Sequence, residues 1–149
     1  MEVKKIIEKF GLYFDHIGLN KTYGRMFGLF MTLDKPLSMS DVIEALQISK
    51  STASTELRRL FLMGYIEKVA IPGQRADFYQ LVPNVWQVHF YQKMEMIHKL
   101  SSIVQQIPAK ERKNFKQLNS MSQYCEFMSN KLRLLIQEFT QTQDPLFKV

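Results

Sequence analysis

Cysteine, glycine and proline are scarce in this 149-residue sequence, and it contains no long apolar run. The single cysteine, Cys125, excludes an internal disulfide. Six glycines and five prolines, together with 46% hydrophobic and 23% charged residues, exclude a collagen-like or disordered chain and favour an ordered, mainly helical protein. Residues 1–8 lack the apolar segment of a signal peptide, and no stretch has the length of a membrane span, so we expect a cytoplasmic protein without membrane contact.

Motifs typical of enzymes and metal sites are also missing. His16, His89 and His98 are far apart, and no His or Cys pair has a recognised zinc spacing. Neither a phosphate-binding loop nor a nucleophile elbow occurs. We therefore expect no catalytic residues, no metal, no cofactor and no enzymatic activity.

Positive charge is in excess, with 20 Lys and Arg against 14 Asp and Glu and a net charge of +6. This balance favours an anionic partner such as nucleic acid, although many basic proteins share it. The excess is spread over both halves of the chain, so the local placement of cations has to decide the question.

Helical spacing of apolar residues begins near the N-terminus. A first helix ending at Gly18 is predicted by one stripe: Val3, Ile7, Phe10, Phe14 and Ile17. Asn20 is the expected N-cap of a second helix, which ends before Pro36. Gly24 and Gly28 form a GxxxG pattern in that helix, which close packing against another helix explains better than dimerisation in a membrane.

Two short helices joined by a tight turn are predicted next. Ser38 and Asp41 have the spacing of a capping box that opens a third helix. Ser49 is the expected N-cap of a fourth helix, which ends near Gly64. Its inward stripe is predicted to be Ala53, Leu57, Leu60 and Phe61, and its outward residues Ser51, Thr52, Thr55 and Arg58, flanked by Lys50 and Arg59.

Small hydroxyl residues suit the helix that a helix-turn-helix inserts in the major groove, because they donate or accept hydrogen bonds at base edges. Arg58 can pair with a guanine edge or a phosphate, and Lys50 and Arg59 are expected near the phosphates. The alternative is a well-capped helix whose arginines are merely solvated. The order of capped helix, turn, helix and hairpin favours DNA binding.

The hairpin is predicted from two runs rich in β-forming residues, 65–71 and 77–82, with a turn at Pro72-Gly73-Gln74. Arg75 lies at or beside its tip, where it can reach the DNA backbone or minor groove, or alternatively remain solvated. The complete predicted DNA-binding set is Ser38, Ser49, Lys50, Ser51, Thr52, Thr55, Arg58, Arg59, Gln74 and Arg75.

Regular helical spacing returns after Pro83. One apolar stripe runs from Trp86 to Ile107, and after Pro108 a second runs from Leu118 to Phe139 with Cys125 among its apolar positions. A small winged helix cannot cover these stripes, so we expect a homodimer. The predicted fold is mainly α with a small β-hairpin wing, a single domain with a DNA-binding lobe at 20–83 and dimerisation helices at 1–19 and 84–143.

The segment from Gly24 to Leu81 resembles the winged helix of MarR-type transcriptional regulators. Residues 36–38 and 46–54 are most similar to the GbsR-related branch, and residues 48–50, 57–60 and 75–79 also carry the match. The resemblance covers somewhat over a third of the chain. It implies a homodimer, with interlocking terminal helices, that places two recognition helices in successive major grooves of a double-stranded DNA operator and acts as a repressor.

The resemblance also implies a small-molecule effector pocket between the dimer helices and the DNA-binding lobe. Such a pocket could hold a quaternary ammonium ligand through cation–π contacts with aromatic side chains. The candidate residues are Tyr13, Phe14, Tyr23, Trp86, Phe90 and Tyr91, and the alternative is that they pack in the core. Cys125 is expected to be a buried small apolar residue rather than a redox sensor. The competing function for the whole chain is a winged helix that docks a protein instead of DNA.

Overall fold

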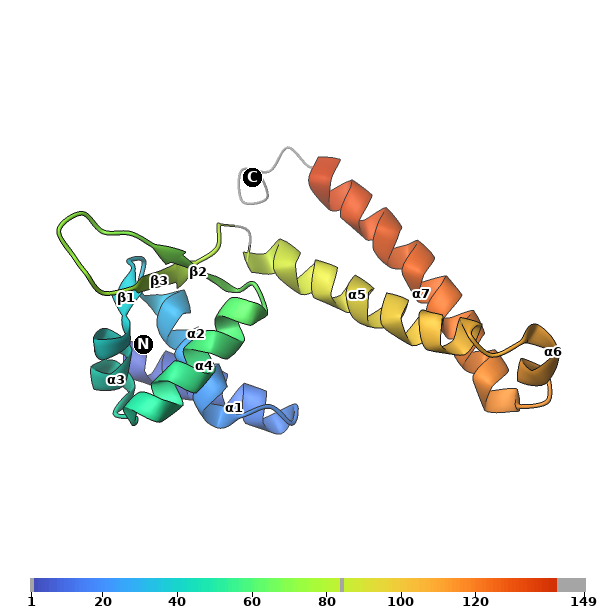
Figure 1. Cartoon of the computed structure of the whole chain (residues 1–149), viewed down its shortest axis with the longest axis horizontal. Coiled ribbons are helices and arrows are strands. Elements are labelled where there is room, and N and C mark those ends of the chain that lie inside the picture. The colour runs from blue at the N-terminus through green and yellow to red at the C-terminus, as the bar shows by residue number, and fades with distance from the viewer. Residues whose placement is uncertain (1, 84, 142–149) are drawn as a thin grey trace. The chain divides into compact units, whose positions relative to one another are not determined.

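The structure is a computed structural model that describes residues 2–83 and 85–141, with Thr140 described only by its backbone. It contains two compact units, Met1–Val85 and Trp86–Val149 (Figure 1). The predicted dimerisation segments include residues 1, 84, 142 and 143, which lie outside the described residues. The unit boundary falls close to the predicted end of the DNA-binding lobe, and the first helix is part of the first unit.

The first unit is a winged helix-turn-helix with the predicted order of elements. Its elements are α1 (Val3–His16), α2 (Lys21–Thr32), β1 (Leu37–Ser38), α3 (Met39–Leu46), α4 (Lys50–Leu62), β2 (Ile66–Val69) and β3 (Phe78–Leu81). The strands form an antiparallel sheet in the order β1-β3-β2. Strand β1 was not predicted, because two residues are too few for an alternating pattern and only the pairing of Leu37 with Tyr79 and of Ser38 with Phe78 defines it.

Helix α1 packs very closely on α2, as the GxxxG pattern predicts. A Cβ atom on Gly24 would lie 2.6 Å from the carbonyl oxygen of Phe10, and one on Gly28 would lie 2.9 Å from the Cβ of Phe10. Both distances are shorter than real Cβ contacts, so only glycine permits this approach. The glycines therefore fix α1 directly on the helix that supports the helix-turn-helix.

The core of the first unit lies where α2, α3 and α4 meet the sheet. Met26, Val42, Ala53 and Leu60 are fully buried there. The predicted stripe of α1 is buried only in its middle, because Val3 and Ile17 at its ends are exposed. Asn20 caps α2 as predicted, with its Oδ1 accepting hydrogen bonds from the amides of Thr22 and Tyr23.

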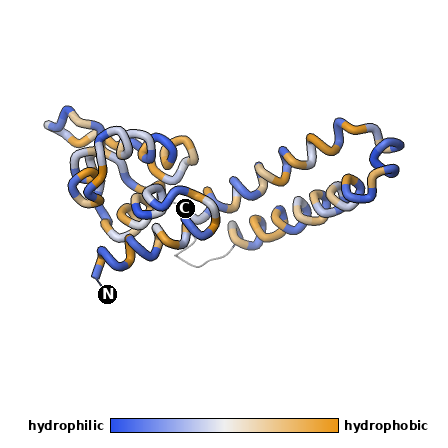
Figure 2. The backbone as a smooth tube through the Cα atoms, turned by 90° about the horizontal axis from the view of Figure 1, so that it is seen from below, coloured by the Kyte–Doolittle hydropathy of each residue, from blue (hydrophilic) through white to orange (hydrophobic). Residues whose placement is uncertain are grey.

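The second unit is a helical hairpin of α5 (Val85–Gln105), whose first residue still belongs to the first unit, the short α6 (Ala109–Arg112) and α7 (Lys116–Gln141). Helices α5 and α7 run in opposite directions, and hydrophobic and hydrophilic residues alternate along both (Figure 2). Ile97, Cys125 and Leu132 are buried between them, which confirms Cys125 as a buried apolar residue. No helix in the described part of the chain combines the length and apolar character that crossing a membrane requires.

Many large apolar side chains of this hairpin are exposed. Trp86 and Leu135, two positions of the predicted stripes, are among them. Among the described residues of the hairpin, the exposed large apolar side chains are Trp86, Tyr91, Met96, Ile103, Phe115, Tyr124, Phe127, Leu134 and Leu135. A two-helix hairpin has too few layers to cover both sides of each helix, so this surface is left without a partner within the hairpin.

Candidate nucleic-acid interface

Helix α4 is the predicted recognition helix, and it begins as the sequence predicts. Ser49 has extended backbone angles, and its Oγ accepts a hydrogen bond from the amide of Thr52 at 3.1 Å. The hydroxyls of Ser51 and Thr52 lie 2.9 and 2.8 Å from the same oxygen. Three hydroxyls therefore converge at the start of the helix, where backbone N–H groups and the helix dipole also favour an anion.

The outward face of α4 is polar and cationic. The exposed polar residues of α4 are Lys50, Ser51, Ser54, Thr55, Arg58 and Arg59, and the buried residues of the helix are Ala53, Glu56, Leu57 and Leu60. The predicted orientation of the helix is thus confirmed for all its predicted outward residues except Thr52, which is half-buried. Ser54 was missed, although its helical position beside the inward stripe provides the signal that would have found it.

One residue of α4 differs from its predicted orientation, and another has a partner that was not predicted. Phe61 was predicted to face inward but is 43% exposed, because the buried side of α4 is centred on Leu57 and Leu60, which are almost fully buried. The role of Arg59 beside the phosphates stays a prediction; in this structure its Nη1 lies 3.3 Å from Oε1 of Glu56, which is only 4% exposed. Arg59 is thus the counter-ion of a buried carboxylate.

Glu56 lies in a polar cluster beneath the recognition helix. Burial raises the pKa of the Tyr23 phenol well above its usual value, and repulsion from the nearby Tyr65 and Glu56 raises it further. Burial also raises the pKa of Tyr65. The raised pKa values keep both phenols neutral at physiological pH. The cluster connects α2, which carries Tyr23, to the inner side of α4.

Ser38 is held at the start of α3 by the predicted capping box. Its hydroxyl donates to Oδ2 of Asp41 at 2.6 Å, its amide donates to the same oxygen at 2.7 Å, and the amide of Asp41 donates back to the hydroxyl. These hydrogen bonds lower the pKa of Asp41 below its usual value. In this structure the side chain of Ser38 serves the cap, and its role as a DNA contact stays a prediction.

The wing is the loop between β2 and β3 (Figure 1). The amide of Gln74 donates to the carbonyl of Ile71 at 3.0 Å, and Gly73 has φ of +80°, as in a type II turn with Pro72 before the glycine. Gln74 and Arg75 are both exposed. The turn predicted from Pro72-Gly73-Gln74 is confirmed, and it places Arg75 next to the tip.

Arg58 and Arg75 are available to bind an anion. Within residues 2–83 and 85–141, neither guanidinium has an ion-pair or hydrogen-bond partner. Lys68, which was not predicted, also lies near the wing, but its Nζ is 2.8 Å from Oδ2 of Asp77, which raises the pKa of the lysine. Arg58 and Arg75, which the sequence analysis proposed as DNA contacts, are therefore both unpaired in the described structure.

A groove of about 320 Å³ separates the C-terminal half of α4 from the sheet. Its wall is mainly apolar, and Arg58 and Lys68 supply cations to it. The lining residues are Met39, Ser54, Leu57, Arg58, Phe61, Leu62, Lys68 and Tyr79. The groove is thus bordered both by the recognition helix and by the strands that carry the wing.

Three of the six aromatic residues predicted for an effector cage lie together in the first unit. The ring of Phe14 lies 5.5 Å from those of Tyr13 and Tyr23 and 5.6 Å from that of Phe27, between centroids. These contacts favour the core-packing alternative for Phe14 and Tyr23, since neighbouring rings occupy the space that a cation would need. Trp86, Phe90 and Tyr91 belong to the second unit, where Phe90 packs against Phe139.

Comparison with known proteins shows similarity to transcriptional regulators. The chain is 30% identical over 86 residues to the HTH-type transcriptional regulator MmpR5 of Mycobacterium tuberculosis, covering 57% of this chain and 52% of that protein. It is 30% identical over 82 residues to the HTH-type transcriptional repressor OpcR of Bacillus subtilis, covering 55% of this chain and 44% of OpcR. The matches therefore span about half the length of these two relatives. No protein-family model matches the chain.

Two further likenesses extend over nearly the whole chain. YvaV of Bacillus subtilis, provisionally named as an HTH-type transcriptional regulator, is 25% identical over 159 aligned positions that cover 95% of this chain and 88% of YvaV. A crystal structure described as that of a transcriptional regulator superposes with a TM-score of 0.81 at 22% identity, covering 94% of this chain and 99% of that one. The fold is thus a winged helix-turn-helix shared with a regulator. The named relatives are regulators rather than enzymes.

Proposed function

We propose that this protein is a transcriptional regulator that binds a specific double-stranded DNA operator as a homodimer. The observation that carries the proposal is the contrast between the two faces of α4. The exposed face carries hydroxyl groups and the unpaired Arg58, whereas the buried face consists of apolar residues and Glu56, which is paired with Arg59. Such a face presents donors and acceptors to base edges without exposing apolar surface at its centre. The names of the relatives support the same function.

In the proposed complex, α4 lies in the major groove and the wing lies near the minor groove. Ser51, Thr55 and Arg58 contact base edges, and Lys50 and the start of the helix contact phosphates. Arg75 at the wing approaches the adjacent backbone or minor groove. The geometry of the free protein favours Arg58 and Arg75 as the main cationic contacts, since Arg59 is paired with Glu56.

A homodimer accounts for the exposed apolar residues of α5 and α7. A second copy of the chain would cover this surface and give a two-fold symmetric pair of recognition helices. The predicted dimerisation segments, 1–19 and 84–143, remain part of this proposal. The protein is further proposed to repress transcription by occluding a promoter, in line with the name of OpcR. The proposal that it is a MarR-type regulator of the GbsR-related branch rests on the sequence resemblance of residues 24–81.

Selection of bound fragments from genomic DNA, followed by gel-shift titration over salt concentration, tests the proposal. We expect one or a few near-palindromic fragments to shift, with a slope of log affinity against log salt of about −0.9 for each phosphate contact. A failure of every fragment to bind would contradict the proposed function. Sedimentation of the same protein would show whether the binding species is a dimer.

A protein-docking winged helix is the second candidate, and one observation favours it. Phe61, Leu62 and Met63 at the end of α4 are 43%, 70% and 48% exposed, and two of them line the apolar groove. Exposed apolar clusters of this kind are typical of protein interfaces. The salt titration separates the two functions, because a protein-docking module would show no shift with any fragment.

The effector proposal depends on aromatic rings that remain open to solvent. Tyr13, Trp86 and Tyr91 are exposed in the structure, whereas Phe14 and Tyr23 are packed. Calorimetric titration with choline-like cations tests whether the open rings bind a quaternary ammonium group. Absence of heat at millimolar ligand would remove the proposal.

A further inference from the structure

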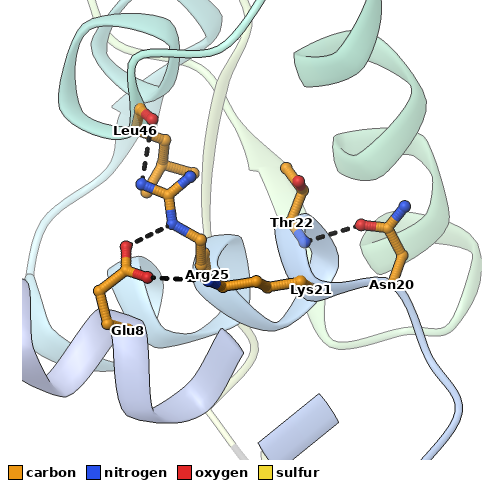
Figure 3. Close-up of polar contacts among 6 residues, drawn as sticks. All are labelled: Glu8, Asn20, Lys21, Thr22, Arg25 and Leu46. Carbon is orange, nitrogen blue, oxygen red and sulfur yellow. Dashed lines mark hydrogen bonds and ion pairs between the residues drawn. The ribbon is translucent and has the colours of Figure 1, made fainter. Parts of the chain in front are cut away.

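Arg25 of α2 makes a bridge between α1 and the end of α3 (Figure 3). Its Nε donates to Oε1 of Glu8 at 2.7 Å, and its Nη2 donates to the main-chain carbonyl of Leu46 at 3.1 Å. The side chain is partly buried, which protects both interactions from solvent screening more than at an exposed site. One guanidinium thus joins three helices that are separate in sequence.

Leu46 is the last residue of α3, so the bridge ends at the turn of the helix-turn-helix. The next residue, Gln47, has φ of +53°, a left-handed conformation that is unfavourable for residues other than glycine. Two residues later Ser49 caps the recognition helix. A cation at the C-terminal carbonyls of α3 is favoured by the helix dipole and satisfies an oxygen that the helix itself leaves unpaired.

The path of the Arg25 side chain depends on Gly11. A Cβ atom on Gly11 would lie 2.6 Å from Cγ of Arg25 and 3.3 Å from Cγ of Lys21. Glycine at this position therefore lets the Arg25 stem cross the surface of α1. The spacing of Gly11 and Arg25 in the sequence does not show that they touch, so this contact was not predictable from it.

We propose that Arg25 is a positioning residue for DNA binding, which holds the turn before the recognition helix in place through Leu46 and ties it to α1 through Glu8. This inference rests on the proposed function. Recognition by hydrogen bonds requires that the contacting side chains be held to within about half an ångström of their binding positions. A turn that contains a non-glycine residue in the left-handed conformation is strained, so it keeps this conformation only when the surrounding structure holds it. Since α1 is a predicted dimerisation segment, the bridge also links the turn to the interface.

The test compares four variants with the wild type: Arg25→Met, Arg25→Lys, Gly11→Ala and Lys21→Met. Arg25→Met removes both hydrogen bonds, Arg25→Lys keeps the charge but lacks the fork that reaches two acceptors, and Gly11→Ala displaces the arginine without changing any charge. Lys21→Met is the matched control, because Lys21 is on the same helix and pairs with Glu8 at 3.5 Å but makes no ion pair or hydrogen bond with α3 in the described structure. Urea unfolding identifies conditions in which every variant is folded.

We expect Arg25→Met and Gly11→Ala to weaken operator affinity about tenfold. Arg25→Lys should weaken it less, and Lys21→Met should bind the operator like the wild type. The slope of log affinity against log salt should stay unchanged, since Arg25 acts through the turn and not on a phosphate. Unchanged affinity of the folded Arg25→Met protein would overturn the proposal. A slope reduced by about 0.9 would also overturn it, because Arg25 would then contact DNA itself.

Amide hydrogen exchange separates this proposal from the proposed function. The amides of Gln47 and Ile48 both donate to the carbonyl of Ile43, so their exchange reports opening of the turn without any DNA. We expect faster exchange at these two amides in Arg25→Met and Gly11→Ala and wild-type rates in Lys21→Met. If the wild type binds no DNA, the exchange pattern still decides whether Arg25 holds the turn, and equal rates in all proteins would refute it.

Discussion

Nη1 of Arg59 lies 3.3 Å from Oε1 of Glu56, one turn earlier on the recognition helix. The carboxylate is buried on the inner side of α4, while the arginine side chain is 56% exposed. A buried carboxylate is tolerated only when it is paired or hydrogen-bonded. Arg59 therefore contributes to the stability of α4, whereas the adjacent Arg58 has no ion-pair partner in the described structure.

Replacing Arg59 by Ala is expected to destabilise the fold. The change leaves the Glu56 carboxylate without its cation, and the exposure of Arg59 reduces the cost to about 1–2 kcal/mol. Urea unfolding measures this loss, and Glu56→Gln in the Arg59→Ala background should recover part of it. A loss of stability that Glu56→Gln does not reduce would show that the pair is unimportant.

Replacing Arg58 or Arg75 by Ala is expected to weaken operator binding while leaving the dimer intact. Neither side chain has a partner in the described structure, so its removal should cost little stability and about 1–3 kcal/mol of binding free energy. Gel shift and sedimentation measure the two effects. Unchanged affinity in both variants would refute the contact assignment.

The capping box predicts a pH dependence of stability. Hydrogen bonds from Ser38 hold the pKa of Asp41 below its ordinary value of 3.8, so the folded state binds a proton less readily than the unfolded state. The contribution of the carboxylate is therefore complete above about pH 4 and is lost as the pH falls through the folded-state pKa. It is present at about pH 7 and diminished at about pH 3.

Asp41→Asn isolates this contribution from those of the other carboxylates. The variant should be less stable than the wild type by about 0.5–1 kcal/mol near neutral pH, and the difference should shrink in acid. Urea unfolding at several pH values measures it. A difference that is independent of pH would mean that the charge of Asp41 does not stabilise the cap.

Alanine at Gly24 or Gly28 is expected to destabilise the protein despite its better helix propensity. The new methyl at Gly24 meets the Phe10 carbonyl oxygen at 2.6 Å, and backbone cannot move aside as a flexible side chain would. Overpacking of this kind costs about 1–3 kcal/mol, more than the gain of about 1 kcal/mol from replacing glycine in a helix. A rise in thermal stability would contradict the close approach of α1 and α2.

Local features of the site were predictable from the sequence. The caps at Asn20, Ser38 and Ser49 and the turn at Pro72-Gly73 depend on residues within four positions of one another, so their hydrogen bonds follow from the types of neighbouring residues. The orientation of α4 was also predictable, because a three- and four-residue spacing specifies which face is buried.

Pairings between distant residues were not predictable, because helical spacing shows which face is buried but not what lies against it. The exposure of Phe61, the pairing of β1 with β3 and the burial of Glu56 depend on how α4 meets the sheet and α2. The bridge from Arg25 to Leu46 likewise requires the approach of α1 that Gly11 permits.

The sequence by itself determined the helices, their caps, the wing turn and the polar face of α4, since each depends on short-range hydrogen bonding and periodic burial. Only the tertiary structure decided which cations remain free. Arg58 and Arg59 are adjacent, chemically identical and both exposed, yet in the described structure only Arg59 is paired with a buried carboxylate. The physical reason is that the function of a charged group depends on the charges and the solvent around it, which the packing of distant segments determines.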